Sequence, residues 1–265
     1  MQETIKSPIE VGTMLFTLVD PNKGHEKAYN RWYERDHFYG GCMVGPYLFA
    51  GRRWVAHRGL KALRYPADSP VANPVQSGSY LAVYWHLKGH REDHVKWSLP
   101  QVQWLYANGR GFPERTHVHT ITYKFDWCSY RDADPVPLEL SLDHNYPGLA
   151  SVIVKRNEGV QQAEVDRWFR ESYLQSWMEG TPVASCSSWT PEPQPDGAPM
   201  AIPRLEDPER CKIQLFFLDS DPQACWNKFV QLGDDFAASE LGRVIFAAPF
   251  VPTVVGTDIY TDELW

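Results

Sequence analysis

The chain repeats one aromatic helix segment at a spacing of about half its length. Residues 30–38 carry Asn-Arg-Trp-Tyr-Glu-Arg-Asp-His-Phe, and residues 166–174 carry Asp-Arg-Trp-Phe-Arg-Glu-Ser-Tyr-Leu. Trp32 and Trp168 are 168 − 32 = 136 residues apart in a chain of 265 residues. A repeat of this length predicts two duplicated domains, because the period of a solenoid is only about 20–50 residues. Two further pairs have nearly the same spacing: Pro46 with Pro182 (136) and Tyr123 with Tyr260 (137).

The pattern of strand and helix formers predicts the same element order in both halves. In the first half, alternating apolar residues and turn signals predict strands at 12–19, 46–56, 79–87 and 116–127. Helices are expected at 25–38, ending at Gly40-Gly41, and at 90–107, interrupted at Pro100. The second half predicts strands at 150–155, 182–189, 211–218 and 252–261, with helices at 162–178 and 222–241.

This β-α-β-β-α-β order is the ferredoxin-like supersecondary pattern. The fold class expected is therefore α+β, with two tandem ferredoxin-like units. The first unit is expected at 1–130, a proline-rich linker at 131–147, and the second unit at 148–265. The 57–78 segment is a long connection, which is typical of a functional excursion.

Charge, cysteine content and aromatic content limit the classes of partner and the cellular compartment that the chain is expected to have. The net charge is −7 and the pI is about 5.7, which argues against a nucleic-acid partner because phosphate binding needs clustered Lys and Arg. No apolar run approaches the roughly 20 residues of a membrane span. Five cysteines without a CxxC pair, together with a polar amino-terminal segment, predict a reduced, cytoplasmic protein. Aromatic residues make up 14% of the chain, enough to fill a core or to line a pocket for a flat ligand.

The first copy of the repeat resembles a known superfamily. An Arg-Trp-Tyr-Glu-Arg-Asp-His helix end at 31–37, the Gly45-Pro46 turn and the Arg-Arg-Trp strand at 52–54 resemble the dimeric α+β barrel superfamily, and its EthD-like group in particular. Muconolactone isomerases, polyketide cyclases and small monooxygenases are wider relatives. The resemblance implies that the antiparallel sheets of the two units pair into one barrel, here within a single chain. It also implies a pocket in each unit, between the sheet and its helices.

Asp36 and His37 match the acid-histidine pair of that group, whereas Ser172 and Tyr173 stand at the equivalent positions of the second unit. Histidine exchanges protons near neutral pH, so His37 is a candidate general acid or base. Tyr33, four residues earlier, is within reach of His37 on a helix. The alternative is that His37 is a cation stabilised at a helix C-terminus. A Cys42–His37 nucleophile pair is a further alternative, as is a Cys42 that is only a small buried hydrophobe.

The strands supply further candidates. His86, His117 and His119 lie on strands that neighbour each other in this topology, with His117, His119 and Tyr123 expected on one face. They are expected to line a polar pocket, or alternatively to bind a metal, since imidazole suits Zn, Cu, Fe and Ni. Of these, His86 joins Asp36 and His37 as a catalytic candidate. The substrate-binding candidates are Trp32, Arg53, Tyr84, His119 and Tyr123.

The sequence therefore favours a cofactor-independent lyase, isomerase or cyclase that acts on a hydrophobic aromatic or polycyclic small molecule. No phosphate loop, serine elbow, HExxH or dinucleotide fingerprint is present. One alternative is a non-catalytic ligand-binding or accessory protein of a degradative pathway. Another is a haem- or metal-dependent oxidoreductase, because haem binders exist among the wider relatives. The barrel architecture is also compatible with a homodimer of the fused chain.

Overall fold

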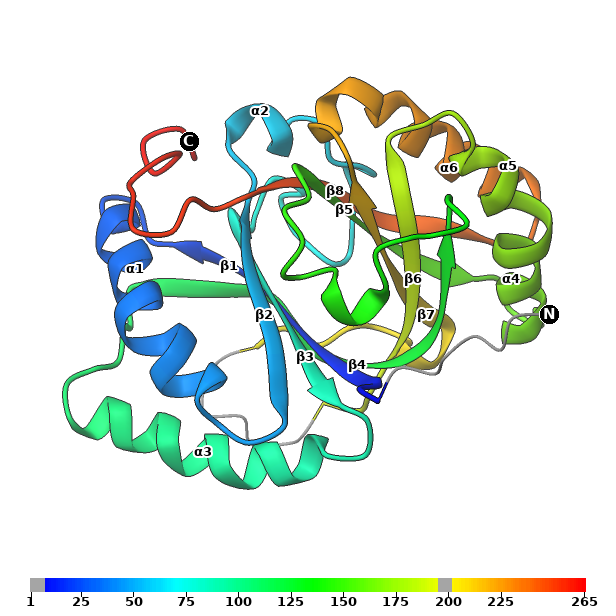
Figure 1. Ribbon diagram of the computed structural model, residues 1–265. Coiled ribbons are helices and arrows are strands. Elements are labelled where there is room, and N and C mark those ends of the chain that lie inside the picture. The colour runs from blue at the N-terminus through cyan, green and yellow to red at the C-terminus, as the bar shows by residue number, and fades with distance from the viewer. Residues whose placement is uncertain (1–7, 195–201) are drawn as a thin grey trace.

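Eight antiparallel strands close into one barrel in the computed structural model, which describes residues 8–194 and 202–265 (Figure 1). Around the barrel the strand order is β1-β3-β2-β8-β5-β7-β6-β4. The strands are β1 (Val11–Pro21), β2 (Leu48–Val55), β3 (Tyr80–Leu87), β4 (Arg115–Tyr130), β5 (Gly148–Arg156), β6 (Val183–Pro191), β7 (Cys211–Leu218) and β8 (Gly242–Pro252).

The barrel consists of two four-stranded sheets joined at both edges. The first unit orders its strands β4-β1-β3-β2, and the second orders them β8-β5-β7-β6. The fourth strand of each unit pairs with the second strand of the other: β4 with β6, and β2 with β8. An edge strand exposes unpaired backbone groups, and this mutual pairing covers β4 from Tyr123 to Tyr130 but covers β2 only at Trp54 and Val55. The α+β class and the pairing of two ferredoxin-like sheets are confirmed.

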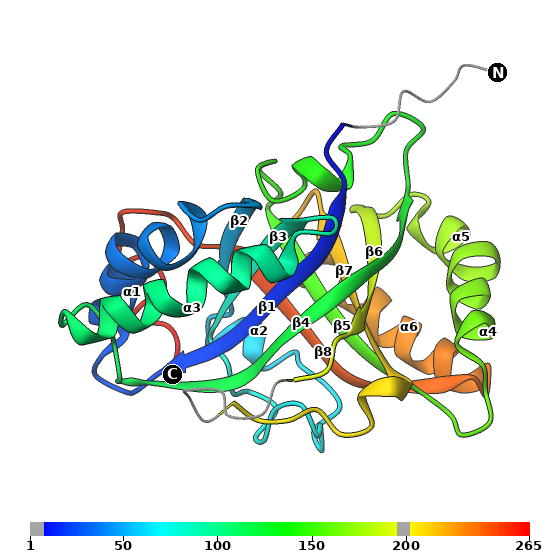
Figure 2. The ribbon, with the colours of Figure 1, turned by 90° about the horizontal axis from the view of Figure 1, so that it is seen from below.

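Helices cover the outer face of each sheet, one group per unit, as Figures 1 and 2 show from two directions. The first unit carries α1 (Glu26–Trp32), which continues as a π-helix, η1 (Tyr33–Met43), and also α3 (Arg91–Ala107). The second unit carries α4 (Gln162–Arg167), the π-helical η3 (Trp168–Tyr173), α5 (Leu174–Met178) and α6 (Trp226–Ala238). Short helical turns occur at α2 (Arg58–Lys61), η2 (Leu138–Leu140), η4 (Pro208–Arg210) and η5 (Pro222–Cys225).

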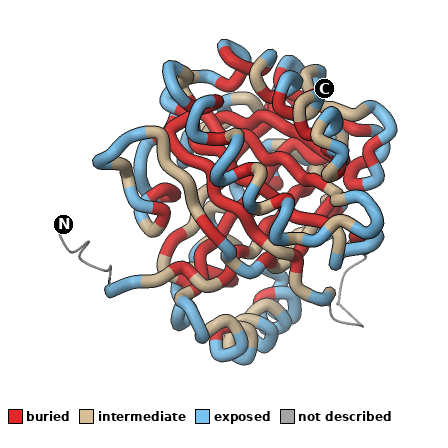
Figure 3. Tube along the Cα trace, turned by 90° about the vertical axis from the view of Figure 1, so that its right-hand side faces the viewer, coloured by how far each residue is buried: buried red, intermediate tan, exposed pale blue. Residues whose placement is uncertain are grey.

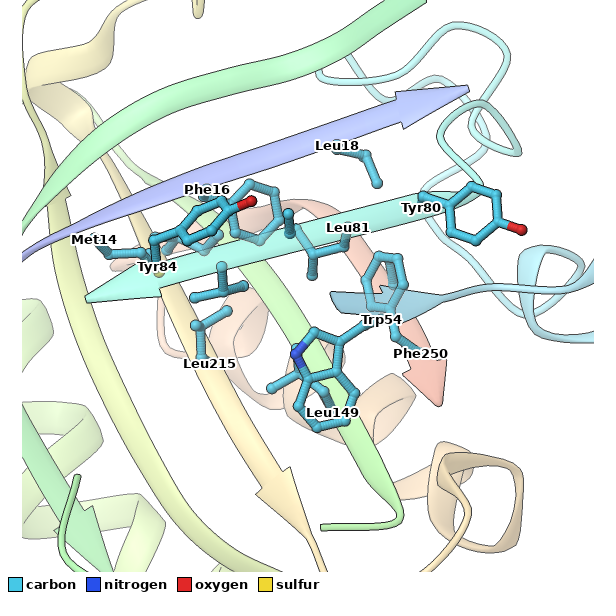
Figure 4. Close-up of a cluster of buried hydrophobic side chains, with 14 of the residues drawn as sticks. Met14, Phe16, Leu18, Trp54, Tyr80, Leu81, Tyr84, Leu149, Leu215 and Phe250 are labelled. Carbon is cyan, nitrogen blue, oxygen red and sulfur yellow. The ribbon is translucent and has the colours of Figure 1, made fainter. Parts of the chain in front are cut away.

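Alternation along the strands separates a barrel interior from a helix-covered face. On β3, Trp85 stacks on Trp189 of β6 at 4.8 Å between ring centroids, inside the barrel. Its neighbour Tyr84 points the other way and meets Tyr33 of η1. Large apolar side chains such as Phe16, Trp54 and Leu215 fill the interior (Figure 4), and most strand residues are buried, with β4 the least so (Figure 3). Each such side chain contributes about 1.5–3 kcal/mol by leaving water.

Three local expectations are wrong. The first helix does not end at Gly40-Gly41 but continues as η1 to Met43. The helix α3 is not interrupted at Pro100, because that proline is on its exposed face, where water can bond the carbonyl left without a donor. The last strand lies at 242–252 and not at 252–261, so Tyr260 falls in the segment after the strand and its pairing with Tyr123 is not a structural repeat.

Segments outside the sheets tie the two units together. The 57–78 connection packs on the second unit, where the backbone amide of Tyr65 donates to Ala247 and the Ser69 hydroxyl donates to Ile245. After β8, residues 253–265 cross to α1 of the first unit (Figure 1). There Arg31 forms a bidentate bond with Asp258. In the described ranges, no helix is both long enough and apolar enough to cross a membrane.

Candidate functional site

Both units build the same ring stack at the end of their first helix. A π-helix forms i→i+5 hydrogen bonds, which brings residues five apart onto one side of the helix. In the first unit Trp32 stacks on His37, with ring centroids 4.9 Å apart and planes inclined by 19°. In the second unit Trp168 stacks on Tyr173 at 4.4 Å and 17°. The repeat therefore conserves the stack, but only the first unit places a histidine in it.

The His37 ring is packed tightly by its neighbours. Tyr33 contacts it edge-on at 4.9 Å, as the sequence predicted. The Cys42 thiol lies 3.9 Å from His37 Nε2. A Cβ on Gly41 would stand 3.0 Å from His37 Nδ1, so the glycine makes room for the imidazole. We call His37, Trp32, Tyr33, Cys42 and Tyr84 the His37 cluster.

The hydroxyls of Tyr33 and Tyr84 share a hydrogen bond of 2.8 Å at the inner end of this cluster. Tyr84 comes from β3 and Tyr33 from η1, so the pair links the sheet to the helix. The sequence predicts Tyr84 as a substrate contact and Tyr33 only as a neighbour of His37. The hydroxyl pair was missed because it depends on a contact between residues 51 positions apart.

Burial makes the whole cluster electrically neutral at pH 7. Desolvation, followed by the positive field of Arg115, lowers the pKa of His37 to about 3, although part of the residue's surface stays exposed. Desolvation raises the pKa of the Cys42 thiol to about 12, and it raises the pKa values of Tyr33 and Tyr84 well above 10. The neutral imidazole can accept a proton, and the hydroxyls can donate hydrogen bonds. The thiol is not a thiolate, which disfavours the Cys-His nucleophile pair.

Arg53 lies behind the cluster, buried between helix and sheet. Its guanidinium sits over the ring of Tyr33 at 4.3 Å and donates to the Asn30 side chain at 2.8 Å. Glu34 lies 3.4 Å from the same nitrogen, Nη1. Among the described residues, Nε and Nη2 have no hydrogen-bond partner and face aromatic rings, which attract a cation through their π-systems.

Asp36 does not point toward His37. Its carboxylate bonds Arg35 at 2.9 Å and Arg110 on the loop after α3. Burial alone would raise the pKa of this carboxyl, but the two arginines outweigh burial and hold the pKa below its usual range. Asp36 therefore fixes the α3–β4 loop against the first helix. The Arg110 contact was not predicted, since it joins residues 74 positions apart.

The strand histidines do not converge on one face. A bulge on β4 pairs Leu18 with His119 but Val19 with His117, so the two histidines point to opposite faces. His119 lies inside the barrel, bonded through Nε2 to the Tyr123 hydroxyl at 2.6 Å. The expectation of a shared face is thus wrong for His117 and is correct for His119 with Tyr123.

His86 lies on the helix-covered face, two residues beyond Tyr84 on β3, and contacts Thr13 and α3 rather than the His37 ring. Its Nδ1 is 3.1 Å from the Thr13 hydroxyl, and its ring is 4.9 Å from that of His94 on α3. Desolvation lowers the pKa of His86 to about 3. Across the part of the chain that the structure describes, no group of three or more His, Cys, Asp or Glu residues could hold a metal ion.

In the second unit, the residues at the equivalent positions form hydrogen bonds and ion pairs with their neighbours. The Tyr173 hydroxyl donates to Asp235 at 2.7 Å, which anchors the stacked ring to α6. On the sheet below, the buried Lys212 bridges Asp126 at 3.0 Å and Asp166 at 2.8 Å. These contacts are structural ion pairs and hydrogen bonds. Tyr173 also lacks the proton-accepting ring nitrogen that His37 has.

Comparison with known proteins supports the fold. No family model matches the chain, and no curated protein matches it either. Three solved structures align along nearly its whole length. A protein assigned as a chlorite dismutase has a TM-score of 0.56 at 12% identity and covers 96% of this chain and 100% of its own. An anthrone oxidase-like protein has a TM-score of 0.53 at 8% identity, with 94% and 96% covered.

The encapsulated DyP-type peroxidase of Mycobacterium smegmatis has a TM-score of 0.55 at 10% identity, with 98% and 97% of the two chains covered. Identities this low carry information on the fold alone. They agree with a ferredoxin-like α+β barrel built from two units. Proteins named for unrelated reactions share this architecture, so the fold does not select one chemistry.

Proposed function

We propose that the first unit binds a hydrophobic, aromatic or polycyclic small molecule and removes a proton from it without a cofactor. Such a step is common to isomerases, lyases and cyclases. The observation that supports the proposal is His37 itself. It is a neutral imidazole, stacked on Trp32, and the second unit replaces it with a tyrosine at the same point of the same stack.

His37 acts as the general base in this proposal. The C–H bond of the substrate breaks, the imidazole accepts the proton, and the electron pair moves onto a substrate carbonyl oxygen. The hydroxyl pair of Tyr33 and Tyr84 donates a hydrogen bond to that oxygen. A pKa near 3 makes His37 a weak base, but attraction between the new imidazolium and the enolate offsets this inside a desolvated site.

The remaining candidates take supporting roles. Trp32 supplies the aromatic surface, and Arg53 adds positive potential behind Tyr33. Asp36 and His86 lie outside the His37 cluster, and we assign them positioning roles: Asp36 for the α3–β4 loop, His86 for the contact with α3. His119 and Tyr123 face the barrel interior and would meet a substrate only there.

We further propose that residues 1–130 form the working unit, joined by 131–147 to a second unit at 148–265 that lost its site after duplication. In this proposal the chain belongs to the EthD-like group. The Arg-Trp dipeptide shared by the two helix ends supports the duplication, and Tyr173 in place of His37 supports the loss.

Hydrogen exchange at carbon tests the proton abstraction directly. Anthrone, a polycyclic aromatic ketone, is a suitable probe, and an anthrone oxidase-like protein is among the structures that share this fold. The probe is incubated with protein in D2O, and deuterium uptake at its methylene carbon is followed by NMR. Wild-type protein should accelerate uptake, and His37→Gln should reduce the acceleration by about 10²–10⁴-fold. Equal uptake with both proteins would refute the assignment.

Two alternatives give different outcomes in the same samples. A non-catalytic binding protein would quench tryptophan fluorescence on adding anthrone but would not accelerate exchange. A haem- or metal-dependent oxidoreductase would show a Soret band or a stoichiometric metal on elemental analysis. The residues fit a haem poorly at His37, because Trp32, Tyr33 and Gly41 pack against its ring. A metal held by His86 and His94 would need ligands beyond those two residues.

A further inference from the structure

A positively charged groove lies on the surface of the first unit, beside Trp32. It has a volume of 710 Å³ and runs between α1 with η1 and the loop that follows α3. Its lining residues, here named the arginine groove, are Ala28, Arg31, Trp32, Arg35, Asp36, Gly109, Arg110, Gly111 and Phe112.

The groove is a local exception in an acidic chain. Three arginines line it, whereas the whole chain has a net charge of −7. The two carboxylates that neutralise them in part are Asp36 and Asp258. Three positive and two negative charges leave a net charge of +1 at the groove.

Asp36 organises two of the arginines. Its side chain is 3% exposed, and its bonds engage Nε and Nη2 of Arg35 and Nη2 of Arg110. None of these bonds to Asp36 uses the Nη1 group of Arg35 or Arg110. Two guanidinium groups fixed around one buried carboxylate form a rigid pair of donors, and planar donors of this kind suit a carboxylate.

An aromatic surface adjoins the charged one. Phe112 stacks on Trp32 at 5.4 Å between centroids and 23° between planes. The indole N–H of Trp32 donates to the Arg110 carbonyl at 2.8 Å, so the ring and the arginine keep a fixed spacing. Trp32 is only 5% exposed and already stacks on His37 and Phe112, so the half-buried Phe112 is the ring that a ligand can reach while its carboxylate bonds the arginine pair.

We propose that the arginine groove is a binding site for a small aromatic carboxylate; it shares Trp32 with the His37 cluster but does not include His37. The volume is within the range of small-molecule sites, about 300–1,000 Å³. The charge selects an anion, the paired guanidinium groups select a carboxylate, and the half-buried Phe112 ring favours an aromatic group beside it. The His37 side of Trp32 is not part of this site, so the proposal does not depend on proton abstraction.

Isothermal titration calorimetry with benzoate at low ionic strength tests the proposal. Wild-type protein should bind benzoate, and cyclohexanecarboxylate and inorganic phosphate should bind at least several-fold more weakly. Arg35→Gln and Arg110→Gln should each weaken benzoate binding about tenfold or more, the loss expected for one charge-assisted hydrogen bond. Arg243→Gln, which removes an exposed arginine of the second unit, should leave the affinity unchanged.

Three results would overturn the inference: no benzoate binding at 10 mM, about the millimolar limit of weak recognition; equal affinity in wild type and Arg35→Gln; or phosphate binding as tight as benzoate. Arg35 is exposed, so its variant is expected to fold even if the Arg110 variant loosens the loop. Thermal unfolding of each variant verifies this. The Arg35 and Arg110 variants leave His37 unchanged. A result that overturns benzoate binding therefore does not bear on deuterium exchange at His37, and each proposal can be refuted without the other.

Discussion

The buried neutral histidines should make the protein sensitive to mild acid. Four histidines have a folded-state pKa far below the usual 6.5, and desolvation is the main cause in each case: His37 and His86 at about 3, and His117 and His119 at about 4. In the unfolded chain these residues protonate near pH 6.5. The unfolded state therefore binds protons first, and folding stability falls as the pH drops below 6.5.

The size of the effect follows from proton linkage. At pH 5 an unfolded histidine is 1.5 pH units below its pKa, while the folded residue is still mostly neutral. Each group then costs 2.303RT × 1.5, or about 2 kcal/mol, and four groups cost about 8 kcal/mol as an upper figure. That is comparable with a typical free energy of unfolding of about 5–15 kcal/mol. The lowered pKa of Asp36 reduces the free energy of unfolding only below about pH 4, where carboxylates of the unfolded chain protonate. It therefore does not contribute between pH 7 and pH 5.

Urea unfolding at pH 7, 6 and 5 measures this directly, with tryptophan fluorescence and far-UV circular dichroism recorded on the same samples. The midpoint should fall steeply between pH 6 and pH 5. His119→Gln should recover about a quarter of the pH-dependent loss, since it removes one of the four groups. A free energy of unfolding that changes by less than about 2 kcal/mol from pH 7 to pH 5 would refute the reasoning, because one group alone accounts for that much.

Three substitutions test the packing, two beside the His37 cluster and one in the second unit. Gly41→Ala places a Cβ 3.0 Å from His37 Nδ1, so deuterium exchange should fall while unfolding stability drops only about 1–3 kcal/mol; unchanged exchange would show that the imidazole can shift freely. Asp36→Asn weakens the bond to Arg110 and should raise protease cleavage in the α3–β4 loop, while the rate of deuterium exchange stays within a few-fold of wild type. A loss of exchange comparable to that of His37→Gln would mean that Asp36 takes part in the chemistry. Lys212→Met leaves two aspartates without their cation and should destabilise the protein by about 3–5 kcal/mol in urea unfolding; a neutral effect would contradict the buried ion-pair assignment.

The sequence predicted element types well wherever periodicity was strong. The alternation of Tyr80, Ala82, Tyr84 and His86 is a property of the strand itself, and the structure confirms their shared face. The strand at 211–218 is confirmed to the residue. The last strand was misplaced because residues 244–252 form a continuous apolar run without period-two alternation, whereas 252–261 was taken as the strand.

The site could be predicted only in part. His37 and Tyr33 were found because both lie on one helix face. The His117–His119 separation depends on a bulge, which is set by pairing with β1 and leaves no mark in a single strand. The stack of Trp32 on His37 joins residues five apart in a π-helix. It could not be predicted from α-helical geometry, in which neighbours are three and four residues apart. The Asp36–Arg110 and Tyr33–Tyr84 contacts join distant segments, and only the fold brings them together.

The central claim is that proton transfer belongs to the first unit alone, and a matched pair of variants tests it most directly. His37→Gln and Tyr173→Phe alter the same point of the same ring stack in the two units. Deuterium uptake by anthrone is measured for both variants beside wild-type protein, with urea unfolding to verify that each is folded. The account predicts that His37→Gln loses the acceleration by about 10²-fold or more, while Tyr173→Phe retains it. Retention by His37→Gln, or an equal loss in both variants, would contradict it.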